Sequence, residues 1–169
     1  MRAAGAVVAV ALALALQTTL ARFVIRGTVA LDLVLVVVVY VALSSGSVTG
    51  LLTGAFAGLI QDALSSGVIG IGGLAKTIVG FLAGIIGTQF IVVRPLPRFI
   101  VFFGATVVHA AVFIGLYEVL NLRRFGTPYA AVSGQALANA IVGVVAFQLV
   151  ELLPGAVERR RLTKTNLRR

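Results

Sequence analysis

The sequence predicts an all-α integral membrane protein, a bundle of six transmembrane helices. Hydrophobic residues make up 60% of its 169 residues and charged residues only 11%, and the mean hydropathy is +1.11. A soluble domain carries about a quarter charged residues, because its surface faces water. Apolar runs of near membrane-spanning length also recur along the chain, with short basic clusters between them. Together these observations place most of the surface in lipid.

Six apolar runs are the candidate spans. A helix needs about 20 mainly apolar residues to cross a bilayer. The runs that approach or exceed this length are residues 3–21, 31–43, 48–64, 71–93, 99–122 and 129–153. The second run is short for a full span and its valines favour a strand, but an unpaired strand edge is untenable in lipid, so we expect a helix. The segment Arg94-Pro-Leu-Pro97-Arg98 ends the fourth run, and Pro154-Gly155 closes the sixth.

The first run has a second interpretation. Met1-Arg2, an Ala/Val/Leu stretch and Thr19-Leu20-Ala21 resemble a cleavable signal peptide. The length of the apolar run favours a retained span.

The basic residues predict the orientation and the domain limits. We expect a membrane domain over residues 1–157 and a basic cytoplasmic tail over residues 158–169. With both termini in the cytoplasm, the inner side holds nine basic residues and the outer side holds four. The inner residues are Arg2, Arg94, Arg98, Arg159, Arg160, Arg161, Lys164, Arg168 and Arg169, and the outer ones are Arg22, Arg26, Arg123 and Arg124. This asymmetry follows the positive-inside rule, and clusters that flank spans indicate anionic lipid rather than nucleic acid as the partner.

Glycines four residues apart form the most informative motif. Gly50, Gly54 and Gly58 lie on one face of the third span, with Phe56 between them. In the fourth span Gly80 and Gly84 repeat the spacing. Small residues on one face allow two membrane helices to approach closely. We favour tight packing within the bundle, and a partner helix in the groove is the alternative. The first span carries a looser version of the pattern at Gly5, Ala9 and Ala13, which offers a further docking face.

Charged residues inside spans are costly in lipid and therefore need a partner. Asp62 and Lys76 flank the glycine-rich outer turn between the third and fourth spans, and we predict that they form an ion pair closing this hairpin. A ligand or proton site is the alternative there. Asp32 lies at the start of the second span, where an acid can cap the helix and meet its dipole. Glu118 lies near Arg123 and Arg124, and we expect it to form an ion pair with them at the membrane interface.

The polar residues of the fifth and sixth spans do not assemble into a catalytic or metal site. His109 is the sole histidine, whereas a metal site needs three or four ligands, and the chain has no Cys. His109 and Asn139 lie near the middle of adjacent spans, and we expect them to share a hydrogen bond. No nucleophile, base and acid can be combined, so the sequence predicts a non-enzymatic protein without cofactors.

Four motifs resemble those of the rod shape-determining protein MreD family. They are Leu31-Asp32-Leu33, Gly54-x-Phe56-x-Gly58-Leu59-x-x-Asp62, Gly70-x-Gly72 and Val79-Gly80-Phe81-x-x-Gly84. The length, the six-span layout and the basic tail fit the same family. Two positions depart from its pattern. Proline often precedes the family's opening acid, where this chain has Leu31, and Lys76 stands where the family is more often apolar or neutral.

The resemblance implies a scaffold of the bacterial elongation machinery in the cytoplasmic membrane. Such a protein binds MreC, a single-span protein with a periplasmic coiled coil. Through MreC it links the actin-like MreB to a wall synthase made of RodA and a class B penicillin-binding protein. The family also looks similar in fold to the substrate-binding subunits of energy-coupling-factor vitamin transporters, and this likeness supplies the alternative function. A vitamin site needs several convergent polar or aromatic groups. The outer half of this chain offers few: Gln17, Asp62, Lys76, Glu118 and Gln135. An ion or proton carrier is a third possibility, but its acids would have to line a path at matching depths.

Overall fold

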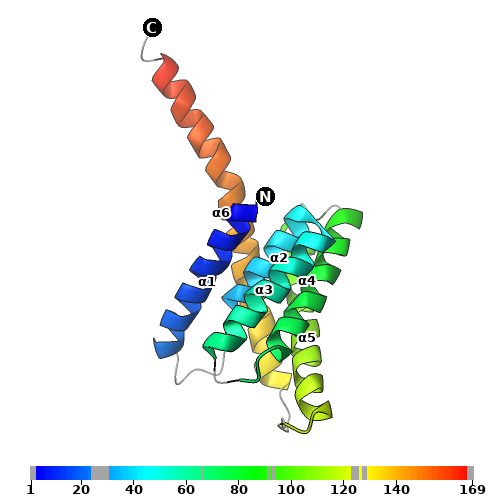
Figure 1. The fold of residues 1–169 in the computed structure, drawn as a ribbon. Coiled ribbons are helices and arrows are strands. Elements are labelled where there is room, and N and C mark those ends of the chain that lie inside the picture. Colours follow the sequence, from blue (N-terminus) through cyan, green and yellow to red (C-terminus); the bar gives the residue numbers. More distant parts are fainter. Residues whose placement is uncertain are drawn as a thin grey trace.

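The computed structural model describes residues 3–23, 31–65, 67–90, 92, 94–122, 126 and 129–166, with side chains for residues 5–19 and for the later ranges as far as residue 152. The described residues form six helices: α1 Ala3–Phe23, α2 Leu33–Ser45, α3 Ser47–Leu64, α4 Ile71–Gln89, α5 Pro95–Val119 and α6 Tyr129–Asn166. Figure 1 shows them packed side by side as one bundle, with the start of α1 and the end of α6 on the same side.

The short helix α2 forms the centre of the bundle and contacts all five other helices. Its side chains are apolar on every face, and a helix of this kind is buried rather than amphipathic. Leu35, Val39 and Ala42 pack into one core cluster with residues of α4, α5 and α6. Val34 and Val38 pack into a second cluster with α1 and with Ala57 of α3. The Val-rich run is therefore the common core of the protein.

Helices α3 and α4 pair closely along the glycine motif. An added Cβ at Gly50 would meet the backbone of Gly80, and one at Gly54 would meet the backbone of Lys76. Nearer the turn that joins the two helices, a Cβ at Gly58 would lie 2.5 Å from the Cα of Gly73. Because these glycines lack side chains, the two backbones approach closely, as small residues allow between membrane helices. The favoured interpretation, packing within the bundle, matches this geometry, and α4 fills the face that the alternative reserved for a partner helix.

The start of α2 lies deep inside the bundle rather than at its outer surface. With 13 residues, α2 is about 20 Å long, against a hydrocarbon core of about 30 Å. The residue before it, Asp32, contacts Asn139, which lies ten residues into α6 and thus about 15 Å from the outer end of that helix. The other end of α2 is close to the end of α4, since a Cβ at Gly87 would meet the backbone of Leu43. Figure 1 shows α2 beginning well above the lower ends of its neighbours.

The ends of the helices follow local rules in most places. Gly46 joins α2 directly to α3 with φ +89°, a conformation that favours glycine. Pro95 starts α5, where a missing N–H costs nothing. Helix α6 is the exception. It continues through Pro154-Gly155 to Asn166, so the end predicted at residue 153 was wrong. The Glu, Arg and Leu residues beyond Pro154 are good helix formers and carry the helix on, and Figure 1 shows it projecting past the bundle.

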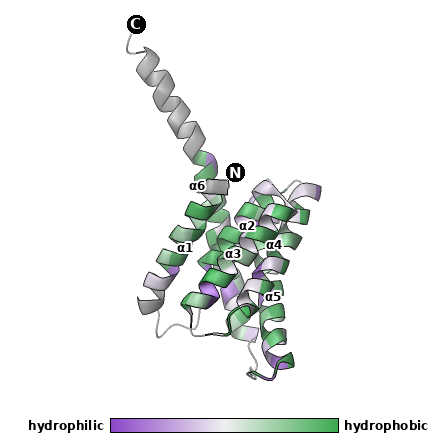
Figure 2. Ribbon diagram, in the orientation of Figure 1, coloured by the Kyte–Doolittle hydropathy of each residue, from purple (hydrophilic) through white to green (hydrophobic). Residues whose placement is uncertain are grey.

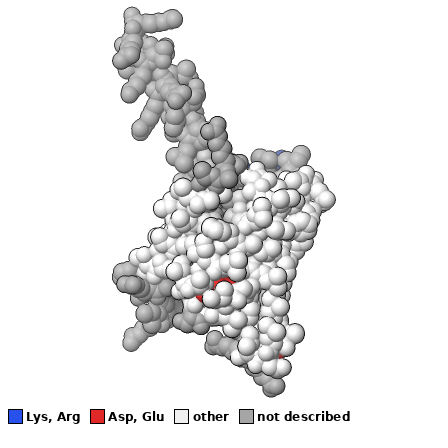
Figure 3. All heavy atoms as spheres, viewed as in Figure 1, with Lys and Arg blue, Asp and Glu red and all other residues white. Residues whose placement is uncertain are grey.

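The outer faces of the bundle suit a membrane. Four helices, α3, α4, α5 and residues 129–152 of α6, are long and apolar enough to cross a bilayer, and α1 and α2 contribute shorter apolar segments. Figure 2 shows hydrophobic colour over most of the ribbon, and Figure 3 shows few charged atoms on the visible face. The chain is therefore a multi-pass membrane protein.

Candidate functional site

The strongest concentration of polar chemistry inside the bundle surrounds the start of α2. Lys76 Nζ lies 2.9 Å from Asp32 Oδ2, and the two residues are only 3% and 5% exposed. Asp32 also caps α2, since its Oδ1 accepts a hydrogen bond from the backbone N–H of Leu35 at 2.9 Å. A buried ion pair is tolerated when further hydrogen bonds satisfy both partners. The structure therefore corrects the predicted Asp62–Lys76 pair: Lys76 belongs to Asp32.

Two further helices, α5 and α6, bring polar groups to the same place. His109 of α5 lies with Nε2 3.2 Å from Lys76 Nζ. Asn139 of α6 accepts from the Asp32 backbone N–H at 3.0 Å and donates to Thr106 Oγ1 at 3.2 Å. The direct His109–Asn139 hydrogen bond expected from the sequence is thus replaced by a wider network. We call Asp32, Lys76, Thr106, His109 and Asn139 the polar cluster.

Helix α1 contributes an additional contact beside the cluster. Gln17 Oε1 accepts from the backbone N–H of Val34 at 3.2 Å. The first N–H groups of a helix have no partner within the helix. At the start of α2, side chains from α1 and from Asp32 satisfy two of them, at Val34 and Leu35. The deep start of α2 is therefore held by hydrogen bonds that lipid could not supply.

Asp62 has a separate task at the start of α4. Its Oδ2 accepts from the backbone N–H groups of Gly70 at 2.9 Å and Gly73 at 3.0 Å. The carboxylate thus caps α4 from the neighbouring helix α3 and closes the outer hairpin that the sequence assigned to an ion pair. Gly70 adopts φ +105°, which favours glycine, and α4 begins at Ile71, where the fourth apolar run begins.

A second buried charge joins the first turn of α5 to Glu151 of α6. Arg98, 3% exposed, donates through Nη1 to Glu151 Oε2 at 2.9 Å, and its Nη2 also contacts Glu151. Its Nε donates to the Val92 carbonyl, and its guanidinium lies 4.3 Å from the centre of the Phe147 ring. A planar guanidinium suits this combination of bidentate pairing and stacking. In the sequence Arg98 is one of several basic residues that indicate orientation, and nothing in its position there reveals the contact with Glu151.

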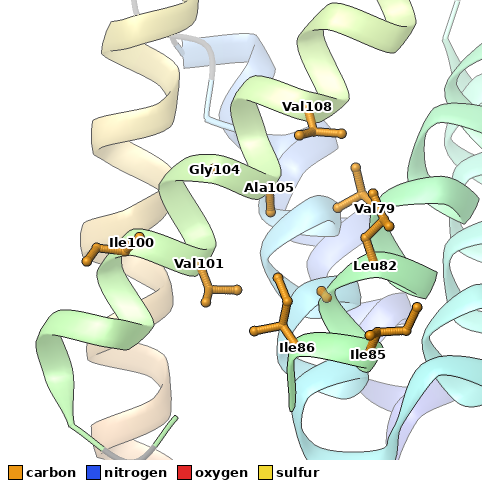
Figure 4. A pocket seen from close by; sticks show the side chains of 10 residues that line it. Val79, Leu82, Ile85, Ile86, Ile100, Val101, Gly104, Ala105 and Val108 are labelled. Carbon is orange, nitrogen blue, oxygen red and sulfur yellow. The ribbon is translucent and has the colours of Figure 1, made fainter. Parts of the chain in front are cut away.

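An apolar groove of about 430 Å³ lies between α4 and α5. Figure 4 shows side chains such as Val79, Ile86 and Val101 directed into the space between the two helices. Every residue that lines it is apolar or glycine. A polar small molecule would find no side chain there to orient it. The groove therefore suits acyl chains or an apolar helix surface.

The remaining predicted residues take simpler positions. Phe56 is exposed, away from the buried glycines of α3. Gly84 packs against the backbone of Ser47. Glu118 is exposed near the end of α5, and its expected partners Arg123 and Arg124 lie outside the described residues. Among the described residues, no three His, Cys, Asp or Glu side chains could hold a metal ion together.

The polar cluster has a structural role: it holds neighbouring helices together. Its carboxylate and ammonium are committed to each other, and its amide and hydroxyl groups bond to the backbone or to one another. Residues from α4, α5 and α6 are thereby joined to the start of α2. The arrangement fixes helices relative to each other.

Comparison with known proteins agrees with this picture. No curated protein and no solved structure matches the chain significantly. A family model does match, described as rod shape-determining protein MreD, over residues 3–154. This range includes all four glycine and acid motifs and the whole polar cluster. The chain belongs to the rod shape-determining protein MreD family.

Proposed function

We propose that this chain is a non-enzymatic membrane scaffold of the cell-elongation machinery, and that it binds the single-span protein MreC. Through MreC it links MreB to peptidoglycan synthesis by RodA and its class B penicillin-binding protein. The family assigns the chain to rod-shape determination. The observation that carries the proposal is that the residues of the polar cluster bond to one another across helices α4, α5, α6 and the start of α2. A bundle fastened in this way presents fixed apolar faces, which is what a partner helix in the membrane needs.

The proposed orientation has both termini in the cytoplasm. It is supported by the excess of basic residues that it places at the cytoplasmic ends of the spans and in the tail, and by the start of α1 and the end of α6 lying on one side of the bundle (Figure 1). In this orientation the polar cluster and Asp62 lie toward the outer side, and the Arg98–Glu151 pair lies near the cytoplasm. The MreC helix would then pack against the lipid-facing surface of the bundle, and its coiled coil would lie on the periplasmic side.

Co-purification from native membranes tests the proposal. Affinity-tagged chain, co-expressed with MreC and solubilised in mild detergent, should retain MreC through washing. MreC whose span is replaced by an unrelated single span of equal length should be lost. Equal retention of the two MreC forms would place the contact outside the membrane. Absence of both would remove the adaptor proposal.

The alternative is a vitamin-binding subunit of an energy-coupling-factor type transporter. Its supporting observation is a group of buried polar residues in the outer half of the bundle. Those groups, however, bond to one another, and the apolar groove offers no polar side chain. The observations therefore favour the scaffold. A thermal shift with any of a panel of water-soluble vitamins would support the transporter instead.

A further inference from the structure

His109 belongs to the polar cluster, yet a purely structural role in the scaffold does not require a side chain that can gain a proton at this position. His109 is 8% exposed, stacks on Phe113 with ring centres 5.9 Å apart, and has Nε2 3.2 Å from Lys76 Nζ. Lys76 Nζ is at the same time 2.9 Å from Asp32 Oδ2. One ammonium therefore bridges a carboxylate and an imidazole, in a place where water does not compete.

The geometry fixes the protonation state of the three groups. Lys76 Nζ pairs with the Asp32 carboxylate at 2.9 Å, so the nitrogen between Asp32 and His109 is an ammonium. An ammonium has donors and no acceptor, which makes His109 Nε2 the acceptor and leaves the ring proton on Nδ1. The trio then carries one negative and one positive charge. A neutral sum is what a site buried in a membrane protein tolerates.

We propose that the cluster is a proton-sensitive latch: a proton taken up from water by His109 Nε2 releases the start of α2. Protonation removes the acceptor of the Lys76 hydrogen bond and places two cations 3.2 Å apart around a single carboxylate. The net charge of the trio rises from zero to plus one. Lys76 and His109 then repel each other, and Asp32, which both pairs with Lys76 and caps α2, is pulled from its position.

Among the residues whose side chains the structure describes, no second acid near the cluster is free to balance the added charge. On α6 the facing group is Asn139, which is uncharged, and on α5 itself it is Thr106. On α3 the carboxylate of Asp62 is occupied by two backbone amides of the α4 start. The other charged residues with described side chains are far along the helices or exposed: Arg94, Arg98, Glu118 and Glu151. The response to acid is therefore centred on His109.

The sole histidine makes the protonation state directly observable. The full chain, labelled with ¹⁵N-histidine and placed in lipid nanodiscs, gives the imidazole signals of a single residue. At pH 7.5 we expect a neutral ring protonated at Nδ1. A cationic ring, or one protonated at Nε2, at this pH would overturn the proposal whatever the variants do.

Thermal unfolding, monitored by circular dichroism, measures how protonation of His109 changes the stability of the fold. If a proton on His109 releases the start of α2, acid destabilises the folded state, so the stability should fall as the pH is lowered. Between pH 7.5 and 5.5 the wild-type Tm should fall by about 4 °C or more. The variant His109→Gln keeps an acceptor for Lys76 and cannot be protonated, so its Tm should stay nearly level. An equal fall in both proteins would assign the effect to another group and refute the latch.

Hydrogen exchange shows whether the effect is local. After correction for the intrinsic pH dependence, the amides of Val34 and Leu35 should lose about tenfold of their protection at pH 5.5 relative to Val41 and Ala42 at the other end of α2. Equal behaviour of both ends of the helix would contradict release at its start.

Discussion

At the residue scale, Lys76 decides how the buried charges are distributed. The sequence places two acids, Asp32 and Asp62, at plausible distances from it. Which acid pairs with Lys76 depends on how α3 and α4 are aligned. The two helices approach so closely that Asp62 faces the backbone at the start of α4 rather than the side chain of Lys76. The short second span was the available signal for the correct partner. A helix of 13 residues that ends flush with α4 must begin at depth, which brings its capping acid to Lys76.

Removal of one member of this pair should be far more harmful than removal of both charges. Asp32→Leu leaves a buried ammonium without its carboxylate, and Lys76→Met leaves the reverse, so each should cost about 3–5 kcal/mol and lower the Tm by on the order of 10 °C. The double variant Asp32→Asn with Lys76→Met leaves no isolated charge and keeps a capping side chain for α2. It should recover most of the loss, as measured by thermal unfolding in micelles. Losses that simply add would exclude the Asp32–Lys76 pair.

Asp62 should behave as a cap and not as a member of an ion pair. Asp62→Ala removes the acceptor for Gly70 and Gly73, and we expect a loss of about 1 kcal/mol, or about 3 °C in Tm. Asp62→Asn keeps an oxygen acceptor and should lose less than half as much. If Asn proved as harmful as Ala, the negative charge itself would be required and the cap interpretation would fail.

At the element scale, the sequence revealed helices more readily than their places. The glycine spacing correctly indicated close packing at Gly50, Gly54 and Gly58, because small residues at four-residue intervals have few other uses in a membrane helix. The central place of α2 could not be predicted, because a helix that is apolar on all faces does not indicate which side packs against which neighbour. The continuation of α6 beyond Pro154 could not be predicted, because a proline followed by glycine usually ends a helix.

The α3–α4 contact yields a matched pair of glycine substitutions. Alanine normally stabilises a helix over glycine by about 1 kcal/mol. At Gly104 on α5 an added Cβ meets nothing within 4 Å, so Gly104→Ala should be neutral or stabilising. At Gly54 the Cβ would strike the backbone of Lys76, so Gly54→Ala should lower the Tm by several degrees and Gly54→Leu should prevent folding. Equal tolerance of alanine at both positions would mean that α3 and α4 are not so closely packed.

At the scale of the whole molecule, the orientation can be read with single cysteines, because the chain has none of its own. Ser65→Cys, in the turn after α3, should react with a membrane-impermeant maleimide added to intact cells. Thr88→Cys, exposed near the end of α4, should react only after the membrane is opened. The reverse result would invert the proposed topology while leaving the fold intact.

The central claim is that this family member acts by presenting the lipid-facing surfaces of tightly packed helices to a partner, and that its buried charges hold those helices together. Rescue of cell shape tests this most directly, in cells whose chromosomal copy is depleted and which carry the double variant Asp32→Asn with Lys76→Met. At neutral pH the variant should fold, retain MreC and restore rods as wild type does. Rounded cells that nevertheless contain folded, MreC-bound variant would contradict the account, because the buried pair would then have a role beyond holding the bundle together.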